Sequence, residues 1–478
     1  MDRKPNIVLI MFDHQLFYKH GFLDNRVKHP HFDNFVKEST FFENAFSVCP
    51  LCGPARRSIV NGLYPHKHGQ VTNKLTEVKE KTYFDLLNKN GYENFYFGKW
   101  HAGIGKPLEL FGCKGFSPES YNNPYLHDDY NDYLKRYNLS TPKGAIEFSE
   151  SDIEYFKKDT VVELNGFHSL YTLTFGTLIT PKETHECYYL ATRACETLEE
   201  LAKNPDKPFS LRVDFWGPHQ PYFPTKEFLD LYDLDEIEIY PSFDDDLKNK
   251  PEIYKNENAV TLSKDHVIIY PNPQTKENWK KMLKYAYAHN TMCDAAAGMI
   301  INKLKKLNIY DNTIVIWSAD HGDALGSHGG HIDKNCYLSE EVVRIPLAIH
   351  NPFCDNISVS KSIVSNLDIP ATIADICGEK EYFEDSVSLN DYLESHKEGR
   401  PYFVIETHGH FQKHFGRAVC YKNYRYIYNE GMIDELYDME QDPYQMNNLI
   451  NDLKYKDIKE KLIGYLKEWQ EKTNDKII

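Results

Sequence analysis

The sequence predicts an α/β fold: a large, mostly parallel sheet flanked by helices, with a smaller C-terminal α+β subdomain. Short apolar runs alternate along the chain with longer stretches of helical periodicity, a pattern typical of parallel sheets. The apolar runs are continuous, as in strands buried on both faces. They lie at Asn6–Phe12, Asn94–Phe97, Leu211–Phe215 and Thr313–Ser318. The helical patterns cover Tyr188–Lys203, Trp279–Leu307 and Asp368–Ile376.

A composition change after Gly378 predicts two domains, a main domain of residues 1–378 and the subdomain of residues 379–478. Within the subdomain, Arg417–Asn429 has the pattern of two paired strands, and Leu453–Lys472 that of an amphipathic terminal helix. Two stretches rich in Tyr, Asn, Asp and Pro, 105–185 and 222–278, interrupt the main domain. We expect them to be inserted loops that shape a substrate pocket or decorate the surface.

The negative net charge argues against two classes of binding partner. The chain has 478 residues, with 55 Lys and Arg against 71 Asp and Glu, so its formal net charge is −16. Nucleic acids and anionic membranes attract basic surfaces, so we expect neither as a partner. An anionic substrate would require locally concentrated positive charge. No apolar run reaches the roughly 18 residues of a membrane helix, and no export signal is recognised. We therefore expect a cytoplasmic protein whose ten cysteines are reduced thiols.

The run Cys49-Pro-Leu-Cys52-Gly-Pro-Ala-Arg56-Arg57 allows several interpretations. The two cysteines could be half of a zinc site, although no second ligand pair has suitable spacing. They could also be a redox pair, although the small βαβ unit around such a pair is absent, or two structural thiols. A helix predicted over Ala55–Asn61 would begin beside Arg56. A cysteine in the preceding turn would then lie near a positive helix end and a guanidinium. This arrangement favours an anion site that contains a potential nucleophile.

Two Asp-His pairs follow predicted strands directly: Asp13-His14 and Asp320-His321. Ligands of open α/β sheets bind beyond the carboxyl ends of the strands. Carboxylate and imidazole ligands suit Ca²⁺, Mg²⁺, Mn²⁺ or Zn²⁺, so the pairs are candidate halves of one metal site. Alternatively, each pair is a helix-capping carboxylate next to a surface histidine.

Further basic side chains lie in loops after strands or in Gly-rich segments: Lys99, His101, His219 and Lys334. Alone, each would be read as solvated surface. Together with Arg56, they would supply the local positive charge that an acidic chain needs to hold an anion.

With these residues placed, the sequence resembles the type I sulfatases of the alkaline phosphatase superfamily. The matching motifs occur in the family's order: Pro5 to Asp13, Cys52-Gly-Pro-Ala-Arg56, Gly98-Lys-Trp-His101, Pro218-His219-x-Pro221, Ser318-x-Asp320-His321-Gly322, Gly326-x-His328-Gly329, Lys334, Arg344-x-Pro346 and Glu435-Leu-Tyr-Asp438. They cover most of the chain. His14 departs from the pattern, because many members have a second Asp at that position.

The resemblance implies that Cys52 is oxidised to formylglycine by a maturase. It further implies that Asp13, Asp320, His321 and the modified Cys52 bind one divalent metal, with Ca²⁺ expected first and Mn²⁺, Mg²⁺ or Zn²⁺ as alternatives. His14 would be an additional ligand of unassigned role. Arg56 and Lys99 would hold the hydrated aldehyde, His101 would act as the base, and His219 and Lys334 would contact the sulfate.

We therefore expect an enzyme that releases inorganic sulfate from an organic sulfate ester, such as a sulfated saccharide. Two alternatives stay open. The first is a phosphonate monoester or phosphodiester hydrolase of the same superfamily, which would use the same nucleophile. The second is a non-catalytic protein that binds a sulfated ligand.

Overall fold

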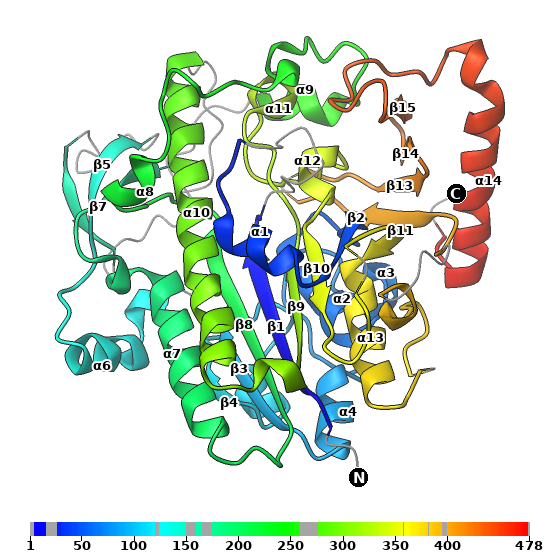
Figure 1. Cartoon of the computed structure of the whole chain (residues 1–478). Helices are drawn as coiled ribbons and strands as arrows, with labels where there is room; N and C mark the ends of the chain where they lie inside the picture. The colour runs from blue at the N-terminus through cyan, green and yellow to red at the C-terminus, as the bar shows by residue number, and fades with distance from the viewer. Residues whose placement is uncertain are drawn as a thin grey trace.

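The main sheet has eight strands in the order β11-β2-β10-β9-β1-β8-β3-β4 (Figure 1). The computed structural model describes residues 4–15, 26–119, 124–149, 159–164, 174–258, 276–356, 358–380, 382–393, 399–410 and 412–476. The strands are β1 (Asn6–Asp13), β2 (Thr40–Phe46), β3 (Glu93–Gly98), β4 (Lys114–Phe116), β8 (Phe209–Pro218), β9 (Thr313–Ala319), β10 (Leu347–His350) and β11 (Val359–Ser365). Only β10 runs antiparallel to its neighbours. The predicted mostly parallel sheet is confirmed.

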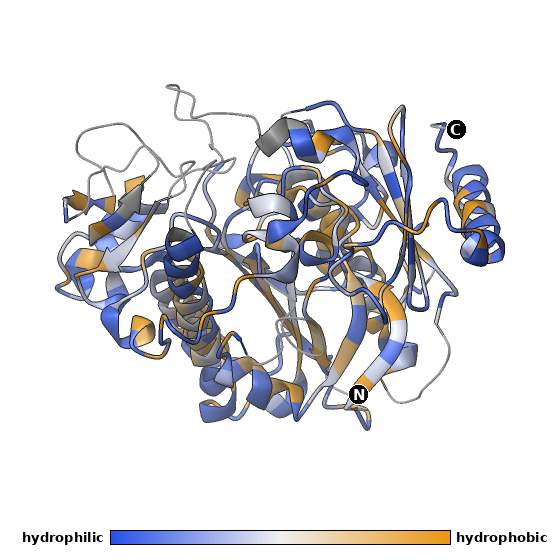
Figure 2. Cartoon of the chain, turned by 90° about the horizontal axis from the view of Figure 1, so that it is seen from above, coloured by the Kyte–Doolittle hydropathy of each residue, from blue (hydrophilic) through white to orange (hydrophobic). Residues whose placement is uncertain are grey.

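Strand β1 lies near the centre of the sheet, between β8 and β9, and all eight of its residues are buried. Its continuous apolar run is explained by this position, because both of its faces are covered by helices. Figure 2 shows the central strands as largely hydrophobic, whereas α14 (Lys456–Thr473) at the edge of the molecule is mixed. No helix in the described part of the chain is both long and apolar enough to cross a bilayer.

Two groups of helices cover the sheet. Helices α7 (Glu186–Leu201) and α10 (Lys276–Lys306) pack on each other and on β8, whereas α2 (Cys52–Asn61), α4 (Tyr83–Lys89) and α13 (Ile369–Ile376) pack together on the other side (Figure 1). The shorter helices are α1 (Pro30–Val36), α3 (Pro65–His68), α5 (Pro107–Leu110), α6 (Asp128–Arg136), α8 (Lys226–Leu229), α9 (Glu252–Asn258), α11 (Ser327–Gly330) and α12 (Glu340–Val343).

Helix α2 differs from its prediction, because it begins at Cys52 rather than at Ala55. Leu51 is extended and forms the N-cap, which leaves Pro54 inside the first turn. The first turn tolerates proline because its N–H groups have no partner within the helix. Cys52 is therefore the first residue of the helix and does not belong to the preceding turn.

The polar region 105–185 contains more structure than the expected loops. Strands β5 (Lys143–Ser149), β6 (Val161–Glu163) and β7 (Thr174–Leu178) form a separate antiparallel sheet in the order β6-β5-β7. Phe223 packs on this sheet so closely that a Cβ at Gly144 would lie 2.5 Å from its ring, and one at Gly176 2.8 Å. An apolar side chain that packs on these strands thus comes from Phe223, which lies outside region 105–185. In region 222–278, residues 259–275 lie outside the described residues.

The C-terminal part forms the predicted α+β unit. Strands β12 (Phe403–Thr407), β13 (Gly416–Tyr421), β14 (Tyr424–Asn429) and β15 (Glu435–Asp438) make an antiparallel sheet, against which helix α14 (Lys456–Thr473) packs. The predicted hairpin at 417–429 is β13 and β14. The domain boundary at residue 379 stays a prediction.

The C-terminal sheet shares a hydrophobic core with the segment that leads into α2. Val404, Leu462 and Trp469 belong to the same buried cluster as Cys49 and Leu51. The two sheets therefore meet through the segment that carries Cys52.

His66 of α3 adds a polar contact to this junction. Its Nδ1 lies 2.7 Å from Oε2 of Glu406 in β12, and its backbone N–H donates to Oε1 of the same carboxylate, also at 2.7 Å. Burial alone would lower the pKa of His66, but the hydrogen bond and the charge of Glu406 raise it above its ordinary value. The folded protein therefore holds a proton at His66 more tightly than the unfolded chain does.

This contact predicts a pH-dependent loss of stability. The contribution of His66 should be complete below its unfolded pKa, about 6.5, and should disappear as the pH rises through the higher folded value. The difference in unfolding free energy between wild type and His66→Gln should therefore shrink as the pH rises above about 6.5, measured by urea denaturation. Burial lowers the pKa of His127, so a His127→Gln control should not show this decline. A constant difference for His66→Gln would contradict the assignment.

Candidate active site at the carboxyl edge of the sheet

The register of the central strands aligns three of the predicted site segments. Asp13 at the end of β1 is paired with Pro218 of β8, and Phe12 is paired with Ala319 of β9. His219 and Asp320 each follow one of these partners directly. Because parallel strands end at the same edge of a sheet, their functional side chains emerge side by side.

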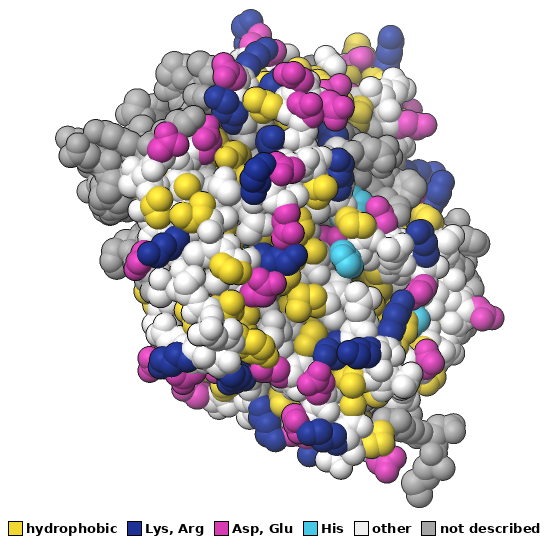
Figure 3. Space-filling view, turned by 60° about the vertical axis from the view of Figure 1, so that its left-hand side comes forward, with side chains coloured by type: hydrophobic (Ala, Val, Ile, Leu, Met, Phe, Trp, Pro, Cys, Tyr) yellow, Lys and Arg dark blue, Asp and Glu magenta, His cyan; other side chains and the backbone are white. Residues whose placement is uncertain are grey.

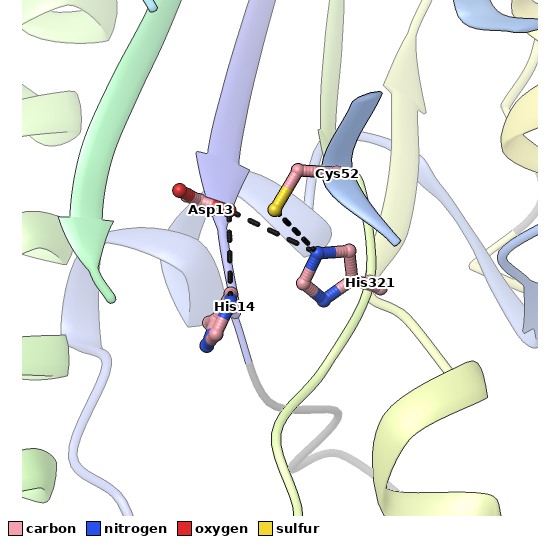
Figure 4. A group of neighbouring side chains, drawn as sticks. All are labelled: Asp13, His14, Cys52 and His321. Carbon is pink, nitrogen blue, oxygen red and sulfur yellow. Dashed lines mark hydrogen bonds and ion pairs between the residues drawn. The ribbon is translucent and has the colours of Figure 1, made fainter. Parts of the chain in front are cut away.

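Four side chains converge at this edge: Asp13, His14, Cys52 and His321 (Figure 4). Each contributes one potential ligand atom, and all four atoms lie within 4.8 Å of one another. Asp13 Oδ1 lies 3.9 Å from both His14 Nε2 and His321 Nε2. All four residues are buried. The set is a candidate metal centre in the described part of the chain.

The opposite nitrogen of each histidine has its own partner. His14 Nδ1 lies 2.9 Å from Asp323 Oδ2, and His321 Nδ1 lies 2.9 Å from the carbonyl oxygen of Gly322. Such second contacts fix the ring orientation and leave Nε2 available as a ligand, as in known metal sites. His14, whose role the sequence left unassigned, is therefore oriented as a ligand would be.

A buried oxygen without a hydrogen-bond partner is a further sign that these residues fit a cation. Asp13 Oδ1 is buried and accepts no hydrogen bond from any described residue. A buried carboxylate oxygen without a partner is costly unless another group compensates it. A divalent cation held by Asp13, His14, His321 and the side chain at position 52 would remove this cost. Asp320 borders the set, with Oδ1 3.8 Å from His321 Nε2.

Cys52 lies at the start of α2, and its Sγ lies 3.1 Å from His321 Nε2. Burial, reinforced by the nearby charge of Asp13, raises the pKa of the Cys52 thiol to about 12. Cysteines that act directly as nucleophiles have a lowered pKa. The encoded thiol therefore lies in the right place for a nucleophile but lacks the properties of an activated one.

Arg56 is fully buried between two carboxylates. Its Nε donates to Asp320 Oδ2 and its Nη1 to Asp214 Oδ2, both at 2.8 Å. Asp214 also accepts hydrogen bonds from Arg212 and from the Tyr96 hydroxyl. Arg56 Nη2 is buried and has no hydrogen-bond partner among the described residues. This N–H group remains available to a ligand.

The two lysines are each paired with an aspartate. Lys99, which follows β3, contacts Asp13, and Lys334 donates to Asp333 Oδ1 at 2.8 Å. Lys334 Nζ also lies 3.3 Å from His219 Nε2. Burial alone would raise the pKa of Asp13, but Lys99 and His219 hold it well below its ordinary value.

His101 lies in the same neighbourhood. Its side chain is buried, and its pKa is held well below the ordinary value by burial and then by the charges of Lys99 and Arg56. A neutral imidazole is the form that can accept a proton. The structure thus gathers every predicted site residue at one edge of the sheet. Cys49, the other cysteine of the motif, is buried in the hydrophobic cluster shared with the C-terminal sheet.

Sequence reasoning missed three buried carboxylates that support this site: Asp214, Asp323 and Asp333. Asp333 Oδ1 lies 3.3 Å from His14 Nε2, and Asp333 forms a second close group with His14 and His219. Asp214 could have been noticed because, with Arg212, it places charge inside an otherwise apolar strand. Asp323 and Asp333 have no such signal, because they lie in a loop whose path the sequence does not reveal.

Two models of known protein families match the chain. A sequence model of the sulfatase family matches residues 5–379, and a model described as N-sulphoglucosamine sulphohydrolase, C-terminal, matches residues 326–472. The chain therefore belongs to the sulfatase family, and it is a sulfuric ester hydrolase, as the sequence motifs predicted. The sulfatase YidJ of Escherichia coli strain K12 is 26% identical over 484 residues, which cover 99% of this chain and 88% of YidJ.

Solved structures confirm the fold. The structure of BT4656 in complex with its substrate D-glucosamine-2-N,6-O-disulfate has a TM-score of 0.74 at 20% identity and covers 99% of both chains. The phosphonate monoester hydrolase SpPMH from Silicibacter pomeroyi has a TM-score of 0.77 at 18% identity, and the alignment covers 98% of this chain and 96% of that one. At such low identities these likenesses establish the architecture alone.

Proposed function

We propose that this sulfatase releases inorganic sulfate from a sulfated saccharide, using formylglycine at position 52 and one divalent metal. The observation that carries the proposal is the placement of Cys52. It lies 3.1 Å from His321 within the group that contains Asp13 and His14, beside the unpartnered Nη2 of Arg56.

The metal would be held by Asp13, His14, His321 and the residue at position 52, with Asp320 as a further ligand at the edge of the set. When bound, a divalent cation would acidify a hydroxyl at position 52 and stabilise negative charge on the transferred group. Two imidazole nitrogens in the set suit Mn²⁺ or Zn²⁺ better than Ca²⁺, which prefers oxygen ligands. Formylglycine would supply a geminal diol: one hydroxyl would attack sulfur and expel the sugar alcohol, and loss of the proton from the other would then expel sulfate and restore the aldehyde.

The residues of the chain divide the remaining work. Arg56 Nη2 and Lys99 would orient the diol, and the neutral His101 would accept the proton that elimination releases. His219 Nδ1 lies 2.6 Å from the carbonyl oxygen of Gln220, which favours a proton on Nδ1 and a lone pair on Nε2, toward Lys334. This tautomer makes Lys334, rather than His219, the group that carries a proton for the leaving oxygen.

Matured protein should hydrolyse sulfate esters in preference to phosphonate esters. We expect a higher kcat/KM for 4-nitrophenyl sulfate than for 4-nitrophenyl phenylphosphonate, because the chain has the Cys52-x-Pro-x-Arg56 signature together with both lysines and both histidines of the site. Cys52→Ala should hydrolyse neither ester. A higher value for the phosphonate, or for a phosphodiester, than for every sulfate ester would favour the alternative hydrolase. Tight binding of sulfated sugars without turnover would favour a non-catalytic binder.

Modification is expected at Cys52 and not at Cys49. Only Cys52 has Pro at +2 and Arg at +4, which is the spacing of the family signature. Peptide mass spectrometry of protein produced together with a radical-type maturase should find the aldehyde or its hydrate at position 52. An aldehyde at Cys49 with Cys52 unchanged would refute the assignment.

Metal content should depend on the carboxylates at the strand ends. Asp13→Ala and Asp320→Ala should each lower the bound metal and reduce kcat by at least about 100-fold while the protein remains folded. The matched control is Asp385→Ala, which removes a buried carboxylate that pairs with Lys67 away from the site. Atomic absorption after reconstitution with Ca²⁺ or Mn²⁺ measures the content. Full metal content and near wild-type kcat in Asp320→Ala would exclude Asp320 as a ligand and leave it a structural partner of Arg56.

A further inference from the structure

A small pocket opens beside His219. Its volume is about 40 Å³, roughly three times the 10–15 Å³ that one water molecule needs. Tyr125, Trp216 and Phe223 contribute aromatic walls, and His219 forms part of the lining. The pocket therefore adjoins the proposed sulfate site on the side of Lys334 and His219.

Three of the polar side chains that line this pocket have buried atoms without a described partner. Glu186 Oε1 accepts a hydrogen bond from the Gly217 N–H at 2.9 Å, but Oε2 has no hydrogen-bond partner among the described residues. Both amide atoms of Gln220 and both ring nitrogens of His289 are likewise buried without a described partner. Exposed fractions are 4%, 1% and 2% for Glu186, Gln220 and His289.

Buried polar groups of this kind are normally satisfied by protein, water or a ligand. Three of them on one cavity wall, next to a substrate-contacting histidine, form a prepared hydrogen-bonding site. Burial raises the pKa of Glu186 to about 8 and lowers that of His289 to about 3, so both are largely neutral at neutral pH. Gln220 is neutral at any pH.

We propose that this pocket is a subsite for a neutral hydroxyl group of the leaving sugar, bound by Glu186, Gln220 and His289. The inference rests on the proposed function, because it assigns the leaving group to the side of Lys334 and His219. A protonated carboxyl, an amide and a neutral imidazole can each donate and accept, which matches the dual character of a hydroxyl. The aromatic walls suit the apolar C–H groups beside such a hydroxyl.

Other occupants fit the pocket less well. A quaternary ammonium group would favour the aromatic walls but has no N–H group to pair with the three polar side chains. A second sulfate would need cations, whereas the polar lining is neutral. The volume holds one or two hydroxyl-sized groups and excludes a second sugar ring. The chemistry therefore selects a hydroxyl next to the sulfated carbon.

The test compares two substrate classes in matured protein. Wild type, Glu186→Leu, Gln220→Leu and Glu186→Gln are assayed with 4-nitrophenyl sulfate, which lacks a sugar hydroxyl, and with the fastest substrate from a panel of monosulfated hexoses. Both Leu variants should raise KM for the hexose sulfate by about 10- to 100-fold and change 4-nitrophenyl sulfate hydrolysis by less than about threefold. Glu186→Gln should retain most hexose sulfate activity, since it remains a neutral hydrogen-bonding group.

The control is Glu200→Leu on the same helix, an exposed position that should leave both activities unchanged. A second measurement needs no variant: replacing the hydroxyl next to the sulfate with hydrogen in the hexose substrate should raise KM for wild type by a similar factor. Equal effects of Glu186→Leu on both substrates, together with no loss for the deoxy substrate, would overturn the subsite. So would a wild-type preference for choline sulfate over every hexose sulfate. Failure of wild type to hydrolyse any sulfate ester would instead refute the proposed function.

Discussion

The site depends on the burial of one guanidinium between two carboxylates. Arg56 contacts Asp214 in β8 and Asp320 after β9, so a single side chain of α2 links two strands of the sheet. Removing either carboxylate would leave the buried guanidinium with a single charged partner, which is more costly than losing a surface ion pair. Helix α2 is therefore fixed relative to the sheet, and with it the position of Cys52.

Pairing with buried carboxylates also explains how an acidic chain keeps positively charged side chains at its site. Arg56, Lys99 and Lys334 are all buried, and each is paired with an aspartate. The face shown in Figure 3 carries no comparable concentration, because it mixes basic, acidic and apolar side chains. Because the buried charges are nearly balanced, recognition of an anion depends on donors such as Arg56 Nη2 that these pairings leave available.

The sequence was sufficient to predict features with local signals. Continuous apolar runs located the central strands, and their ends placed Asp13 and Asp320 at one edge of the sheet. The sequence was insufficient where the position of a residue or strand depends on contacts with distant parts of the chain. Asp333 supports the site from a loop without periodicity, and the small β6-β5-β7 sheet owes its apolar cover to Phe223. The start of α2 was misplaced because Pro54 was read as preceding the helix, although the first turn accepts it.

The hydrophobic core shared by the two sheets has a consequence for the order of folding during synthesis. Leu51 and Ala55, on either side of Cys52, pack in one cluster with Leu462 and Trp469 of α14. Ribosomes release these C-terminal residues some 400 positions after Cys52, at about 5–20 residues per second. For those tens of seconds the native packing of the cysteine segment is incomplete. Helix α14 thus completes, late in synthesis, the packing around a side chain that the finished protein buries.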